Sequence, residues 1–263
     1  MKKWLKITLG IVALLLVIVT MAYAYRSQMT AEMESPEIII RIDGEPLIMK
    51  EEIEEFLRTK QLFYPKMKFE QINFEQIETE LKSMSEIQEV KVYAQIGNKW
   101  VVDIRQRKPI VRIFNKFGET YYIDALGSIV ESNVYHTSRA LVASGNISDK
   151  ATIKTLDSII NNDSLKTIHS LDDIYRISNY VCNDPFLTAQ VSQVYLREDG
   201  DFVLIPQIGD HIIVFGTADS YEEVNSKFRK LITFYKEGIG FEGWNKYSEI
   251  NLKYRDQIVC KKK

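Results

Sequence analysis

The chain is poor in the residue types that most enzymes and metalloproteins use. It holds three histidines, His136, His169 and His211, and none has a second histidine, cysteine or carboxylate at a spacing typical of metal sites. The sequence also lacks a G-x-S-x-G motif, and neither of its two cysteines lies in a catalytic signature. We therefore expect no enzyme activity, no metal and no cofactor.

An excess of basic residues is also missing. The chain has 34 Lys and Arg against 36 Asp and Glu, which argues against a nucleic-acid surface. Gly238, Gly240 and Gly243 do fit a G-x-G-x-x-G pattern. Dinucleotide sites need a strand before these glycines and a helix after them, whereas here a helical pattern precedes them and a strand pattern follows. We expect neither nucleic acid nor a small-molecule substrate as a partner.

The two cysteines, Cys182 and Cys260, lie far apart in the sequence. In an oxidising compartment they could form a disulfide, but nothing in the sequence shows that their side chains meet. We favour one buried thiol and one thiol near the C-terminus.

Against these absences stands one long apolar run, residues 7–24, which contains no charged residue. At about 1.5 Å per residue it makes a helix of about 27 Å, close to the roughly 30 Å of a bilayer core. Trp4 and the pair Tyr23 and Tyr25 fall where interfacial aromatic residues are common. The pattern predicts a transmembrane helix over residues 7–25, with the lipid bilayer as its partner.

The charges around this run predict its orientation. Lys2, Lys3 and Lys6 precede it, so residues 1–6 should be a cytoplasmic tail and the remainder should lie outside the cytoplasm. Ala22 and Ala24 also fit the cleavage site of a signal peptide. Signal peptides usually have a shorter apolar region, so we favour an anchor. The mass of the mature N-terminus would distinguish the two.

The exported part divides into a short spacer, residues 26–35, and two α+β domains. In the first, residues 36–107, Asn73 is a helix N-cap and Gly97-Asn98 is a hairpin turn. Its elements follow the order β-α-α-β-β, namely residues 37–42, 50–57, 73–84, 90–96 and 100–107. Pro109 cannot continue a central strand, so a second, hairpin-rich antiparallel domain with helices should occupy residues 108–263. We expect two separate packed bodies.

Four short segments of the chain resemble motifs of the bacterial FtsQ/DivIB cell-division family. Residues 38–44 are similar to the first strand of its POTRA domain. Residues 101–111 resemble the junction motif V-x-V-x-E-R-x-P-V-A, in which Arg107 and Pro109 match and Gln106 replaces the usual glutamate. Residues 121–127 and 250–254 are similar to later family motifs, and Asn251 stands where the family has an acidic residue.

The resemblance implies a non-enzymatic scaffold that spans the inner membrane once at the division septum, with its C-terminus in the periplasm. It also implies FtsB and FtsL as partners, with FtsB held at the C-terminal strand. Residues 257–261 are expected to pair with residues 250–254 and to leave one open edge, and an open edge invites β-augmentation. The candidate contact residues are Tyr254, Gln257, Ile258, Val259, Cys260 and Lys261.

Two other interpretations remain. Residues 261–263 are all lysine and would protect an exposed edge from aggregation without any partner. The chain would instead be an exported enzyme or ligand-binding protein if its leader were cleaved and its polar residues converged only in three dimensions.

Topology gives the first prediction. A reporter that is active only outside the cytoplasm, fused after Lys263, should be active because the lysine excess precedes the span. Activity of a cytosolic reporter at the same position would reverse the orientation.

Overall fold

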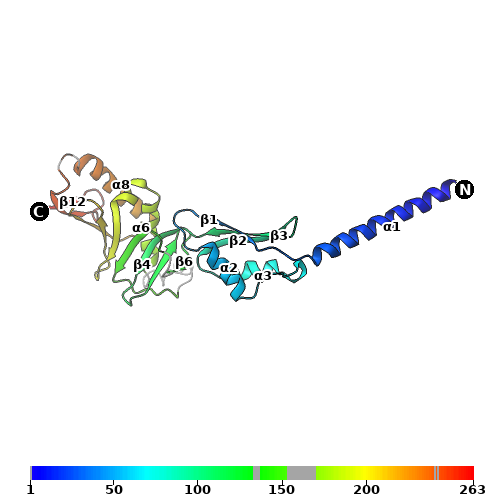
Figure 1. The fold of residues 1–263 in the computed structure, drawn as a ribbon. Helices are drawn as coiled ribbons and strands as arrows, with labels where there is room; N and C mark the ends of the chain where they lie inside the picture. Colours follow the sequence, from blue (N-terminus) through cyan, green and yellow to red (C-terminus); the bar gives the residue numbers. More distant parts are fainter. Residues whose placement is uncertain (1, 133–136, 153–169, 240, 242) are drawn as a thin grey trace. The chain divides into compact units, whose positions relative to one another are not determined.

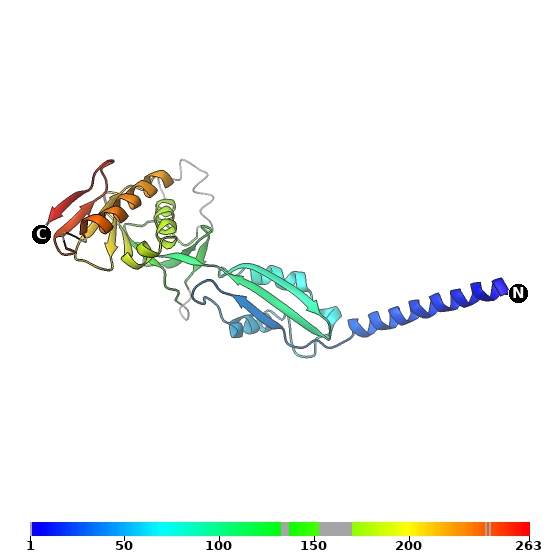
Figure 2. The ribbon, with the colours of Figure 1, turned by 90° about the horizontal axis from the view of Figure 1, so that it is seen from above.

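A computed structural model describes residues 2–132, 137–152, 170–239, 241 and 243–263 (Figures 1 and 2). Its contacts divide the chain into two units. Unit 1 contains residues 1–42 and 48–106, and unit 2 contains residues 43–47 and 107–263. Each unit is described by itself.

Unit 1 begins with the long apolar helix that the sequence predicts, α1 (Lys2–Met29). No residue of its apolar window is buried against the rest of the chain. Among the described residues it is the one helix long and apolar enough to cross a membrane. Its exposed leucine, isoleucine and valine side chains have no protein partner, as expected of a helix surrounded by lipid.

After α1, the described part of unit 1 has the predicted order β-α-α-β-β. The elements are β1 (Glu37–Arg41), α2 (Lys50–Thr59), the 3₁₀ turn η1 (Phe69–Gln71), α3 (Phe74–Lys82), β2 (Ile87–Gln95) and β3 (Lys99–Gln106). The sheet order is β1-β3-β2, in which β3 pairs with β1 in parallel and with β2 in antiparallel fashion. Both helices turn their apolar faces to one core, which also buries Trp100.

Local signals fix these elements. The side chain of Asn73 caps α3 by accepting a hydrogen bond from the N–H of Gln76 at 3.0 Å. The turn between β2 and β3 needs two residues with positive φ, and Gly97 (+87°) and Asn98 (+61°) supply them.

Unit 2 is built on one large twisted sheet covered by helices. In its described part nine strands follow the order β12-β11-β10-β9-β8-β7-β4-β5-β6. The strands are β4 (Pro109–Phe114), β5 (Thr120–Asp124), β6 (Ile129–Glu131), β7 (Leu141–Gly145), β8 (Val191–Leu196), β9 (Phe202–Pro206), β10 (Ile212–Gly216), β11 (Tyr247–Asn251) and β12 (Val259–Lys262). The helices are α6 (Leu171–Cys182), α7 (Pro185–Gln190), α8 (Tyr221–Thr233) and the π-helical segment η2 (Phe234–Ile239).

The α+β class is confirmed, and the sheet is richer in antiparallel than in parallel pairs. Three pairs are nevertheless parallel, β4–β7, β7–β8 and β10–β11, and the sequence pattern did not indicate them. The core of unit 2 lies between the sheet and its helices. The sequence pattern of residues 150–160 favours a helix, and most of these residues lie outside the part of the chain that the structure describes. Cys182 and Cys260 are free thiols, each partly buried against this core.

The two junction residues, Arg107 and Pro109, both contact Asp124 of the next resemblance motif. Arg107 Nη1 lies 2.8 Å from Asp124 Oδ2, and the Asp124 side chain is 2% exposed. Asp124 Oδ1 also accepts hydrogen bonds from the N–H groups of Leu126 and Ser128. Pro109 begins β4 and is paired with Asp124 in β5. The end of the first resemblance motif, residues 107–111, and the second motif, residues 121–127, therefore contact one another where β4 begins and β5 ends; we call this contact the corner.

A short strap of the chain, residues 43–47, belongs to unit 2 although unit 1 flanks it in the sequence. Leu47 is buried with Tyr122 and Val130. Asp43 forms an ion pair with Lys108 at 3.1 Å, and both side chains are exposed.

The corner gives a stability prediction. Asp124→Ala should lower the free energy of unfolding of unit 2 by about 3 kcal/mol, because it leaves the Arg107 charge and two N–H groups without their carboxylate. Asp43→Ala, which removes an exposed ion pair, should change it by less than about 1 kcal/mol. Urea unfolding of the full-length chain, followed by hydrogen exchange of β5 peptides, would compare them. Equal effects would contradict the structural role of Asp124.

Candidate partner-binding edge

Strand β12 is the last strand of the chain and lies at one end of the nine-stranded sheet (Figure 1). It pairs with β11 on one side only: Asn251 faces Val259, Ile250 faces Cys260 and Glu249 faces Lys261. The hairpin expected from the sequence is therefore present. Within the described residues no strand covers the other side of β12.

The strand is shorter than the sequence pattern indicated. Three of the six candidate residues lie in it, namely Val259, Cys260 and Lys261, and Lys262 completes it. Tyr254, Gln257 and Ile258 lie in the connection before it. The expected pairing of residues 250–254 with residues 257–261 leaves only Arg255 and Asp256 for the turn, whereas the observed connection runs over residues 252–258.

The hydrogen bonds at the two ends of this hairpin fix the direction of its N–H groups. The N–H of Lys263 donates to the carbonyl oxygen of Lys246, beside β11, at 3.2 Å. The N–H of Leu252 donates to Val214 in β10 at 2.9 Å. Successive N–H groups of a strand point to opposite sides. The N–H of Leu252 faces β10, so that of Asn251 faces β12 and its partner Val259 faces β11; counting from Lys263 gives the same result for Val259.

Counting back from Lys263, the N–H groups of Val259 and Lys261 face β11. Those of Cys260 and Lys262 face outward, away from the sheet. The outward groups are free to pair with the backbone of an added strand, which is the arrangement that β-augmentation requires. The side chains of β12 lie beside that edge. Val259 is 42% exposed and the lysines are exposed, while Cys260 packs partly on the core.

Lys230 of α8 holds the connection that leads into β12. Its ammonium group donates to the carbonyl oxygens of Tyr254 (2.5 Å), Arg255 (3.1 Å) and Leu252 (3.5 Å). Burial lowers the pKa of Lys230 from its ordinary value, and the nearby charge of Lys227 adds to this effect. These three carbonyl contacts explain why the connection is broad rather than a two-residue turn.

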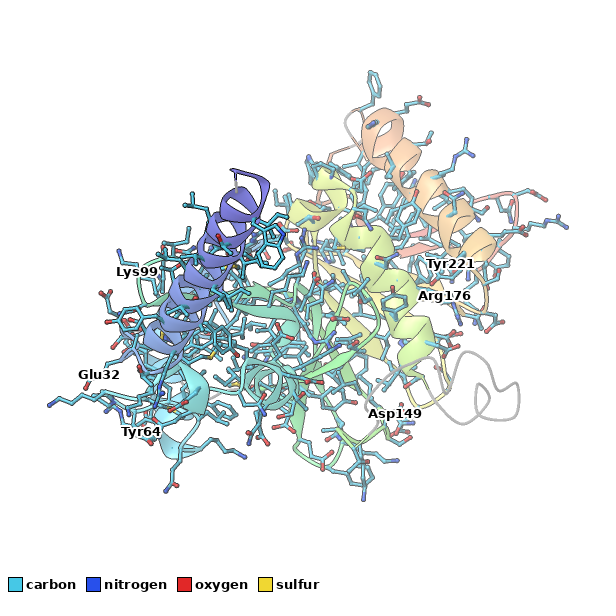
Figure 3. The ribbon with its side chains drawn as sticks, turned by 90° about the vertical axis from the view of Figure 1, so that its right-hand side faces the viewer. Glu32, Tyr64, Lys99, Asp149, Arg176 and Tyr221 are labelled. Carbon is cyan, nitrogen blue, oxygen red and sulfur yellow. The ribbon has the colours of Figure 1, made fainter. Side chains whose placement is uncertain are left out.

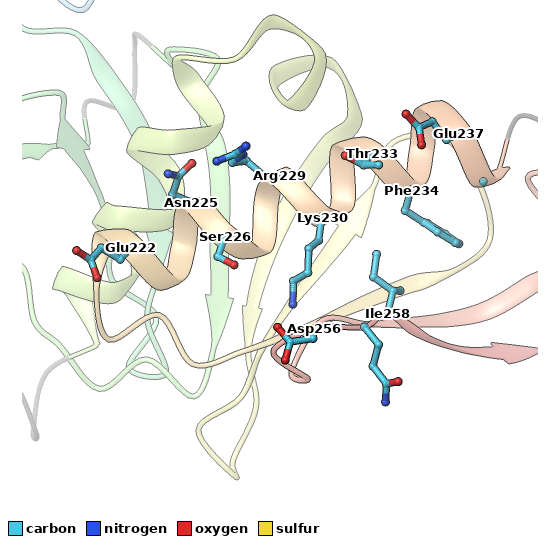
Figure 4. Close-up of a pocket in the computed structure, with 12 residues that line it drawn as sticks. Glu222, Asn225, Ser226, Arg229, Lys230, Thr233, Phe234, Glu237, Asp256 and Ile258 are labelled. Carbon is cyan, nitrogen blue, oxygen red and sulfur yellow. The ribbon is translucent and has the colours of Figure 1, made fainter.

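A groove of about 760 Å³ runs between α8 and this connection (Figure 4). Its apolar surface includes Phe234 and Ile258, and charged side chains of both signs surround it, among them Arg229, Glu237 and Asp256. Lys230 points across the groove toward the connection in Figure 4, whereas Arg229 points away from it. Such a groove suits an amphipathic segment of a protein partner.

An aromatic cluster made of His211, Tyr235 and Trp244 lies in the same unit as β12. His211 is 2% exposed and its Nε2 lies 2.7 Å from the hydroxyl of Tyr235, whose ring stacks on Trp244. Burial lowers the pKa of His211 and raises the pKa of Tyr235 to about 12. Asp210 forms an ion pair with Lys263 at 2.9 Å.

His211 is therefore buried rather than a surface or capping residue, as a lone histidine would usually be. His136 and His169 lie outside the described residues. Among those that the structure describes, no group of three or more histidine, cysteine, aspartate or glutamate side chains could hold a metal ion.

Comparison with family models adds the decisive observation. Residues 108–261 match the model described as FtsQ/DivIB, C-terminal related, which covers more than half of the chain. The chain belongs to the FtsQ/DivIB family. Residues 39–105 match a POTRA-like domain, in agreement with the β-α-α-β-β order of unit 1. No curated protein matches the sequence.

Membership of the FtsQ/DivIB family supports a scaffold role in cell division, with division proteins as partners. Domains of this family are known as non-enzymatic scaffolds. The apolar helix α1 fits a single-pass membrane protein that acts in division.

The carbonyl contacts of Lys230 give a prediction. Lys230→Met should speed amide exchange in residues 252–262 by about tenfold or more, because hydrogen bonds to charged groups contribute about 1.5–3 kcal/mol each. Arg229→Met removes the neighbouring charge but none of these contacts, and should leave this exchange unchanged. Unaltered exchange in the Lys230 variant would show that the connection is held by other contacts.

Proposed function

We propose that this chain is a bitopic scaffold of the division machinery that holds an FtsB-like partner, together with FtsL, on its periplasmic side. In this proposal residues 1–6 are cytoplasmic, residues 7–25 span the inner membrane, and residues 26–35 lead into the periplasm. Residues 36–107 and 108–263 are then the POTRA-like and C-terminal domains at the division septum. Family membership supports the role, and the lysines before the span support the orientation.

The docking site that we propose is the open edge of β12. The observation that carries it is the pair of outward N–H groups at Cys260 and Lys262, on a strand whose other side is paired with β11. A partner strand would add main-chain hydrogen bonds there, and side chains next to the edge would supply specificity. The groove beside Phe234 and Ile258 would receive the adjoining part of the partner.

Lys261 and Lys262 offer a closely matched test, because they are neighbours of the same type with N–H groups that point in opposite directions. Proline removes the N–H group. Lys262→Pro should leave the fold intact and weaken capture of FtsB by about tenfold, through loss of one main-chain bond and a clash with the added strand. Lys261→Pro should break the hairpin with β11 instead, because its N–H faces inward.

Affinity for FtsB and hydrogen exchange of β11 peptides, measured on the full-length chain, would separate the two effects. If Lys262→Pro binds FtsB as tightly as the unaltered chain, β12 is not the docking strand. The lysines would then serve only to protect the edge from aggregation.

A further inference from the structure

Within unit 1, a short segment after the end of α1 is hydrogen-bonded to the packed β-α-α-β-β body. The carbonyl oxygen of Ala31 accepts a hydrogen bond from the N–H of Phe69 at 3.0 Å, and the N–H of Met33 donates to Met67 at 2.9 Å. The Met33 side chain is 5% exposed and belongs to the core of unit 1. The packed body thus begins only a few residues after Met29, where α1 ends.

The same segment holds the tip of the β2–β3 hairpin. The N–H of Glu34 donates to the carbonyl oxygen of Asn98 at 3.0 Å, and the indole N–H of Trp100 donates back to Glu34 at 2.8 Å. From Arg26, the first charged residue after the apolar run, to Glu34 the chain can span at most about 22 Å. The hairpin itself is about 30 Å long, so its tip is the end that lies closer to the apolar run of α1.

The residue at that tip is apolar and fully exposed. Ile96 is 100% exposed, and an added Cβ at Gly97 would have no atom within 4 Å. Turn positions normally carry polar residues, and Ile96 contributes nothing to the packing of the described residues. The lipid around the nearby apolar span offers an environment in which this side chain would be removed from water.

Residues bonded to the segment 31–34, or next to the tip in the chain, include types that are common in the headgroup region of a bilayer. Tyr64 is 48% exposed, and Lys66, Lys68 and Lys99 are exposed; Figure 3 labels Tyr64 and Lys99 together with Glu32. Tyrosine is common at membrane interfaces, and lysine side chains extend toward lipid phosphates. Glu32 and Glu34 oppose that charge attraction, so the apolar side chain has to supply the contact.

We propose that the β2–β3 tip inserts Ile96 into the headgroup region of the non-cytoplasmic leaflet that anchors α1. The POTRA-like unit then touches the bilayer at a second point besides its span. The inference rests on the membrane anchor of the proposed function and goes beyond its partner binding. It does not depend on what docks at β12.

Lipid quenching of a fluorophore tests this on the full-length chain in nanodiscs. Cys182 and Cys260 are first replaced by serine, and a single cysteine carries an environment-sensitive dye at Ile96→Cys. The matched control is Ile42→Cys, an exposed isoleucine of unit 1 that follows β1, at the end of the sheet away from the tip. Leu14→Cys, within α1, reports whether the span is inserted.

A lipid-attached quencher near the headgroups should quench the dye at position 96 several-fold more than at position 42, in purely zwitterionic phosphatidylcholine as well as with anionic phosphatidylglycerol. Equal quenching at the two positions, with position 14 protected from aqueous quenchers, would overturn the inference and leave the anchor intact. Quenching at position 96 only with anionic lipid would also overturn it, because the lysines would then make the contact. An aqueous-exposed position 14 would refute the anchor and the inference together.

Discussion

A sheet must pair the N–H and C=O groups of every strand, and an open sheet leaves one row of them unpaired at each end. In unit 2 that constraint puts β12 at one end, with the outward groups of Cys260 and Lys262 exposed. Two neighbouring contacts hold this edge. Lys230 of α8 donates a hydrogen bond to the connection before β12, and Lys263 at the end of the strand forms an ion pair with Asp210. A strand edge that is already ordered loses less conformational entropy when a partner adds to it.

Most of unit 1 could be predicted from the sequence because its signals are local. The helical period of α2, the cap at Asn73 and the Gly97-Asn98 turn each involve residues within a few positions of one another. The order β-α-α-β-β followed from them, and it matches the POTRA-like assignment. The parallel pairing of β1 with β3 joins segments about 60 residues apart, which no local pattern reports.

The sequence predicted the C-terminal hairpin, but neither its broad connection nor the groove beside it. The sequence predicted a final hairpin of residues 250–254 and 257–261, and Val259, Cys260 and Lys261 do lie in its last strand. The broad connection and the groove depend on Lys230 and Phe234, which belong to α8 and reach residues 252–258 only in the folded chain. The sequence shows a lysine at position 230, but nothing in it indicates which carbonyl groups this ammonium group meets.

The strap at residues 43–47 means that unit 2 is not a continuous stretch of chain. A fragment cut at the start of β4 would keep the whole sheet yet lose Leu47, so Tyr122 and Val130 would lie open to water. Such a truncated fragment would tend to self-associate in solution through that patch. Truncated variants and limited-proteolysis maps of this domain therefore have to include a five-residue piece of chain that a linear boundary leaves out.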